Sequence, residues 1–159
     1  MSKLLLSIIL LLYTMNISAQ NSTDRFVISE NMGSMFGGYG EVHFNQETPI
    51  GKNTAFLDVH RVILLMGHKF NERTTFAAEI EFEHVKEVYI EQAFLNYKIN
   101  DFINLKTGLI LSPMGIINSY HEPTTFNGVE RPNVDKYIIP STWREIGAGI
   151  HGRLLDANL

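Results

Sequence analysis

The sequence offers few side chains at spacings that catalysis or metal binding would need. Cysteine is absent, which excludes thiol nucleophiles and thiolate metal sites. Six histidines are present, with His84 beside Glu83 and His121 beside Glu122, but no HExxH motif or comparable ligand spacing occurs. The GGYG run at 37–40 lacks the GK[ST] that follows in a phosphate-binding loop. The sequence therefore predicts no catalytic residue, no metal site, no cofactor and no enzymatic activity.

The most regular charged pattern is a glutamate at every second position. Glu79, Glu81 and Glu83 alternate with apolar residues in the segment 75–84. A period of two places the two sets on opposite faces of a β-strand, whereas a helix would scatter both around its circumference. The segment is therefore predicted to be a strand with one acidic face. Its other face is apolar and carries Phe76, Ala78, Ile80 and Phe82.

Alternating segments of about ten residues recur along the chain and predict an all-β, antiparallel fold. Residues 62–66 are apolar on both faces, so a helix remains an alternative for the segment that contains them. Strands of a soluble β-sandwich are commonly about five or six residues long, so the greater length favours strands that cross a bilayer at a tilt. The six predicted strands are 35–44, 55–68, 75–84, 89–99, 103–111 and 142–154.

The first 19 residues predict export. Lys3 precedes an apolar run at 4–13, and a small-residue stretch ending at Ala19 completes the pattern of a cleavable signal peptide. The apolar run is too short for a spanning helix, which needs about 20 residues. We expect a signal peptide at 1–19, a periplasmic segment at 20–34 and a β-domain at 35–159. A formal net charge of −4 gives no reason to expect a nucleic-acid partner.

Connection lengths predict an orientation, because bacterial membrane barrels have short periplasmic turns and longer external loops. The two longest connections, 45–54 and 112–141, fall on the same side of the predicted sheet. The short connections 70–74 and 100–102 then become periplasmic turns, and 85–88 a short external turn. Residues 112–141 are thus expected to form a long third external loop.

The sequence between residues 79 and 149 resembles a family of outer-membrane porins. The stretches that carry the resemblance are EIEFEHVKEVYIEQAFLNYKIN, LKTGLILSPMGIIN, YHEPTTFNGVERP and IIPSTWREIGAGIHG. They are similar to porins of the phosphate-selective porin O/P type, particularly those of Bacteroidetes. The resemblance implies a transmembrane β-barrel of about 16 or more strands that passes small hydrophilic solutes, often anions such as phosphate, through a wet lumen. It also implies that a segment starting at Pro113 folds toward the pore.

Six strands are too few for a closed membrane barrel, since about eight is the smallest common number. The chain is therefore expected to be the N-terminal part of a larger porin in the bacterial outer membrane. Its expected partners are outer-membrane lipid, the barrel-assembly machinery and small hydrophilic solutes, and the resemblance is compatible with a homotrimer. The alternative is a secreted soluble β-domain that binds glycans, or a structural or adhesion barrel without transport.

Charges at the narrowest point of a pore set its ion selectivity, and the long loop is the natural constriction. Arg131 and Lys136 are expected to line the pore, or alternatively to pair with Glu130 and Asp135 and hold the loop in shape. Three acids against two bases between 112 and 141 do not make an anion trap. The other candidates at the constriction are His121, Glu122 and Arg144.

A second set of charged residues is expected on the lumen wall, because charge on a lipid face is costly. In the alternative interpretation these side chains form a neutralising cross-strand network that stiffens the wall. The lumen-wall candidates are Glu79, Glu81, Glu83, Lys98 and Lys106.

Overall fold

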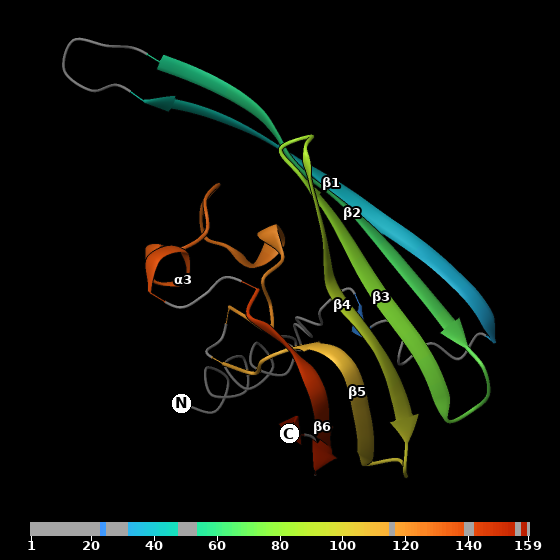
Figure 1. The fold of residues 1–159 in the computed structure, drawn as a ribbon. Coiled ribbons are helices and arrows are strands. Elements are labelled where there is room, and N and C mark those ends of the chain that lie inside the picture. Colours follow the sequence, from blue (N-terminus) through green and yellow to red (C-terminus); the bar gives the residue numbers. More distant parts are fainter. Residues whose placement is uncertain are drawn as a thin grey trace, which may run out of the picture.

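The protein is an open antiparallel β-sheet whose strands follow one another in chain order (Figure 1). The computed structural model describes residues 23–24, 32–47, 54–114, 117–138, 142–154 and 157–158. The predicted signal peptide and most of the segment 20–34 lie outside these residues. The strands are β1 (Gly33–Glu47), β2 (Thr54–Lys69), β3 (Thr74–Glu83), β4 (Glu87–Lys98), β5 (Ile103–Leu111), β6 (Arg144–Leu154) and β7 (Ala157–Asn158).

All six predicted strands are present, and the antiparallel all-β prediction is confirmed. β2 is a strand along its whole length, so the helical alternative for 55–68 is wrong. β1 extends three residues beyond its predicted end, to Glu47, and the two-residue β7 was not predicted. No helix among the described residues is long and apolar enough to cross a membrane.

The two faces of the sheet differ in an unusual way. On one face, here called the polar face, ionisable side chains are buried; Glu79 and Glu91 are both 0% exposed. On the opposite face, here called the apolar face, large hydrophobic side chains are exposed; Phe36, Ile146 and Ile150 are 77%, 87% and 74% exposed. Water-soluble domains mostly bury apolar groups and expose charges. Here charged groups are buried beside the apolar Ile63, Leu65 and Phe94, while the large hydrophobic groups of the other face are exposed. The predicted opposition of Glu79, Glu81 and Glu83 to Ile80 and Phe82 is confirmed.

Two β-bulges interrupt the alternation of faces. The register of β1 and β2 passes from the pair Glu41 and Arg61 to the pair Val42 and Val59, which leaves His60 as the extra residue. The register of β3 and β4 skips Glu91 in the same way. A bulge re-aims the side chains on either side of it. Here each bulge turns two adjacent polar residues toward the same face: His60 with Arg61, and Glu91 with Gln92.

The two short turns at one end of the sheet share one local design. Asn71 accepts backbone hydrogen bonds from Arg73 and Thr74, each at 2.9 Å. Asn100 accepts equivalent bonds from Phe102 and Ile103, also at 2.9 Å. Asparagine favours such turns because its short side chain mimics a backbone carbonyl. The first turn falls within the predicted connection 70–74, and the second extends one residue beyond the predicted connection 100–102, to Ile103.

The described residues of the connection between β5 and β6, here called the β5–β6 connection, are 112–114, 117–138 and 142–143, and they lie on the inner side of the curved sheet (Figure 1). The connection contains the short helices η1 (Pro123–Thr125) and α3 (Asn133–Tyr137). Asn118 closes its base by donating to the carbonyls of Ser112 and Trp143 at 2.6 and 3.0 Å and accepting from the Trp143 amide at 2.8 Å. The connection is therefore a folded structure anchored to both neighbouring strands.

Gly108 lies where β4 and β5 approach each other closely. It has φ +136°, and an added Cβ would lie 2.3 Å from the Ala93 carbonyl oxygen, whereas a Cβ on its cross-strand partner Gly147 would meet no atom within 4 Å. We predict that Gly108→Ala destabilises the full-length protein by about 1–3 kcal/mol and that Gly147→Ala changes stability by no more than about 0.5 kcal/mol. Urea unfolding followed by Trp143 fluorescence measures both, and equal stabilities would contradict this packing.

Candidate functional site

The polar face and the β5–β6 connection enclose a cavity of about 560 Å³. It holds as many acidic as basic side chains, so with neutral histidines its formal charge balances. The acids that line it are Glu41, Glu81, Glu83 and Glu130. The bases are Arg61, Arg131, Lys136 and Arg144.

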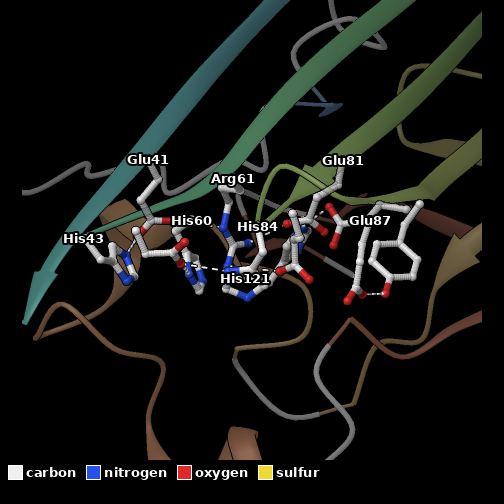
Figure 2. Close-up of polar contacts among 12 residues, drawn as sticks. Glu41, His43, His60, Arg61, Glu81, His84, Glu87 and His121 are labelled. Carbon is white, nitrogen blue, oxygen red and sulfur yellow. Dashed lines mark hydrogen bonds and ion pairs between the residues drawn. The ribbon is translucent and has the colours of Figure 1, made fainter. Parts of the chain in front are cut away.

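Arg61 lies in the middle of the cluster of polar side chains drawn in Figure 2. It is 3% exposed, and its Nε lies 2.9 Å from Glu41 Oε2 while Nη1 lies 3.0 Å from Glu81 Oε1. Nη2 is 3.8 Å from Glu83. One guanidinium thus joins carboxylates from β1 and β3, and removing one partner of such a buried pair typically costs about 3–5 kcal/mol. Glu81 and Glu83 thus have Arg61 as their neighbouring cation, in place of Lys98 and Lys106, which were the cations of the network expected from the sequence.

A second buried cluster joins the β5–β6 connection to β4. His121, from the connection, lies with Nε2 3.2 Å from Glu91 Oε2, and both side chains are fully buried. Glu79 Oε2 accepts from Gln92 at 2.9 Å and from Thr23 at 2.7 Å. His121 Nδ1 and one oxygen each of Glu79 and Glu91 have no hydrogen-bond partner. The contact between His121 and Glu91 therefore holds the connection against the polar face of the sheet.

The surroundings of His121 favour its charged form. Burial alone would lower the pKa of the imidazole, but the hydrogen bond to Glu91 and the charges of Glu91 and Glu79 outweigh burial and raise the pKa above its ordinary value of 6.5. The surroundings thus favour the imidazolium form of His121 beside the Glu91 carboxylate, across the interface between connection and strand.

Glu130 makes a third link between the connection and the sheet. It accepts a hydrogen bond from Asn45 Nδ2 at 2.7 Å and lies 3.7 Å from His43 Nδ1 and 3.6 Å from Lys136 Nζ. The bond from Asn45, followed by the charge of Lys136, lowers the pKa of Glu130. The predicted pairing of Lys136 with Glu130 is therefore present, while the Asp135 side chain lies outside what the structure describes.

Arg131 and Arg144 face the cavity without carboxylate partners among the described contacts. Arg131 lies over the Phe126 ring at 5.7 Å, and its buried Nη1 has no hydrogen-bond partner. Burial and the neighbouring charge of Arg61 lower the pKa of Arg131. Arg144, at the start of β6, lies 5.6 Å over the Tyr89 ring. Unpartnered cations in a cavity are available to an anionic or polar solute.

The remaining predicted residues are more scattered. Lys98 forms an exposed ion pair with Asp101 at 2.7 Å. Lys106 lies 3.1 Å from Asp24 and 4.3 Å over the Phe94 ring. Neither lysine has a described contact with the glutamates of β3. Glu122 is buried beside His121.

Sequence reasoning missed the residues that the bulges turn inward. Arg61, His60 and Glu91 were not candidates, and neither was His43, which reaches the same end of the polar face from β1. The available signal was a pair of adjacent polar residues inside a predicted strand, at 60–61 and 91–92. No metal site was expected, yet three groups of histidine and carboxylate ligand atoms gather within 4.8 Å.

We predict that His121→Ala loosens the β5–β6 connection. A hydrogen bond to a charged group contributes about 1.5–3 kcal/mol, so tryptic cleavage after Lys136 in the native protein should become about tenfold faster or more. Asn127→Ala, which alters an exposed side chain of the same connection, is the control and should leave the rate unchanged.

The same contact should respond to pH. Because folding raises the pKa of His121 above 6.5, its contribution is complete below about pH 6.5 and is lost as pH rises through the raised pKa. The ratio of variant to native cleavage rates should therefore fall toward one at alkaline pH. A ratio of one at every pH would show that His121 does not hold the connection.

Comparison with known proteins gives a partial match and no assigned activity. No protein-family model matches the chain, and no solved structure matches it. A protein of Aquifex aeolicus (strain VF5), described as uncharacterized, is 40% identical over 128 residues. The match covers 76% of this chain and 29% of the relative, so the chain spans less than a third of that protein's length.

Proposed function

We propose that the protein is part of an outer-membrane β-barrel pore that passes small hydrophilic solutes by diffusion. The reversed distribution of side chains over the two faces carries this proposal. An apolar face that exposes Phe36, Ile146 and Ile150 suits contact with lipid. A polar face rich in ionisable groups suits a water-filled lumen.

The energetics favour this arrangement over a soluble one. A basic residue on the lipid face of a barrel costs about 2–4 kcal/mol near the bilayer midplane. The apolar face instead exposes large hydrophobic residues from five strands, among them Phe36, Leu64, Phe82, Ile90 and Ile146. In water the same surface would promote aggregation. The predicted signal peptide supports delivery to the envelope.

Completing the barrel requires further strands. The described sheet has seven strands in an open order, and the last has two residues. A closed membrane barrel needs about eight or more. Most of the Aquifex relative lies outside the match, so a longer protein with room for such strands supports the proposal.

The β5–β6 connection is the proposed constriction. Its contacts through His121 and Glu130 hold it over the polar face, beside the cavity. With four acids and four bases on the cavity lining, the charges favour weak selectivity between anions and cations. Strong phosphate selectivity is therefore not part of the proposal.

We predict that Arg131→Glu shifts the permeability of the complete pore from anions toward cations by roughly twofold or more, because a charge inside a low-dielectric cavity acts where the field is focused. Lys86→Glu makes the same charge change on the exposed β3–β4 turn and should have a smaller effect. Reversal potentials in a planar bilayer with a salt gradient measure both.

The difference between the two variants should shrink as salt rises, since the screening length falls from about 10 Å at 0.1 M to about 3 Å at 1 M. Equal shifts of the reversal potential in both variants would show that the β5–β6 connection is not the constriction. A protein recovered from the soluble fraction, with no conductance, would contradict the pore and favour a secreted β-domain.

A further inference from the structure

Three histidines gather at one end of the polar face (Figure 2). The rings of His43 and His60 stack with centroids 4.1 Å apart, and His84 meets His60 edge-on at 4.9 Å. Asp58 contacts two of them, with Oδ2 3.1 Å from His60 Nδ1 and 2.7 Å from His84 Nδ1. We propose that Asp58, His60 and His84 form a binding site for a divalent transition-metal ion of the Zn²⁺ class.

The donor set matches this class of ion. Two imidazole nitrogens and one carboxylate oxygen, with a position left for water, are common ligands of Zn²⁺. Bond lengths of about 2.0–2.1 Å in a tetrahedral site place ligand atoms about 3.4 Å apart. Asp58 Oδ2 lies 3.1 Å from the His60 nitrogen and 2.7 Å from the His84 nitrogen, and all three ligand atoms lie within 4.8 Å of one another. These distances are close to that geometry, so small side-chain movements suffice to admit an ion.

The backbone holds the two histidines in relation to each other. The His84 amide donates to the His60 carbonyl at 3.0 Å, which ties the β3–β4 turn to β2. The turn closes with a bond from Lys86 N to Glu83 O at 3.0 Å, and its central residues, His84 and Val85, have φ +47° and +64°. Asn-Gly is the usual choice for such a turn, and a β-branched residue at positive φ is strained. The turn thus places His84 beside Asp58 although both of its central residues adopt positive φ, which is strained backbone.

The other two groups of metal-ligating side chains suit an ion less well. In the group of Glu41, His43 and His60, the Glu41 carboxylate is already paired with the Arg61 guanidinium at 2.9 Å, and this cation would repel a metal ion. The group of Glu79, Glu91 and His121 is fully buried, and Glu79 already accepts two hydrogen bonds. By contrast, the His84 side chain is 49% exposed, so an ion can reach it from solvent.

An ion at this site would bridge β2 and the β3–β4 turn at the edge of the cavity, which His60 lines. The inference does not depend on the pore, because ion binding can be measured whether or not the protein conducts. His60 is the bulge residue of β2, so the irregularity in that strand is what brings its ring to the site.

The test is isothermal titration of the untagged full-length protein, folded in detergent, with Zn²⁺. We expect one ion per chain, and at least about a tenfold weaker affinity for His84→Gly and for Asp58→Asn, since even outer ligand partners cost about 10- to 100-fold when lost. His84→Gly also relieves the positive φ and should fold at least as well as the native chain. His68→Ala is the matched control: His68 lies on β2 away from the cluster, 3.0 Å from Ser34.

Unchanged affinity in both His84→Gly and Asp58→Asn would overturn the site, as would the absence of Zn²⁺ binding by the native protein. Loss of binding in His43→Ala with retention in His84→Gly would also overturn it, because the ion would then occupy the neighbouring group. Retained affinity in His68→Ala and His43→Ala, with loss in the two ligand variants, supports the proposed ligands.

Discussion

The guanidinium of Arg61 lies between carboxylates of two neighbouring strands, and the polar face depends on this contact. Buried carboxylates are tolerated only when opposite charge or hydrogen bonds compensate them. Arg61 supplies that compensation for Glu41 and Glu81 on one half of the face, and His121 supplies it for Glu91 on the other. Because His121 belongs to the β5–β6 connection, its contact with Glu91 has two effects. It compensates the buried carboxylate of the polar face, and it positions the connection.

The fold could largely be predicted because strand alternation is a direct consequence of backbone geometry. The segment containing Glu79, Glu81 and Glu83 had its faces assigned correctly from period two alone. The predicted site was less complete, because a bulge at His60 and another at Glu91 shift the period by one residue, and alternation carries no information across such a shift.

The long connection shows a different limit of sequence reasoning. Its length was evident from the sequence, but the contacts that hold it, from His121 to Glu91 and from Glu130 to Asn45, join residues 30 and 85 positions apart. Nothing in local propensity encodes such distant pairs. The expectation that it folds inward came from resemblance, while the role of Arg61 in place of Lys98 and Lys106 came only from the geometry of the bulged strand.

The central claim is that the apolar face contacts lipid while the polar face contacts water. These 159 residues contain no cysteine, so a cysteine introduced among them has no competing thiol in this part of the protein. Ile146 and Gly147 are adjacent residues of β6 with opposite orientations. A fluorophore attached to each cysteine in the full-length protein, reconstituted in vesicles, can be quenched by spin-labelled lipid chains or by aqueous iodide. We expect lipid quenching at 146 and iodide quenching at 147; iodide quenching at both positions would show that the apolar face does not contact lipid.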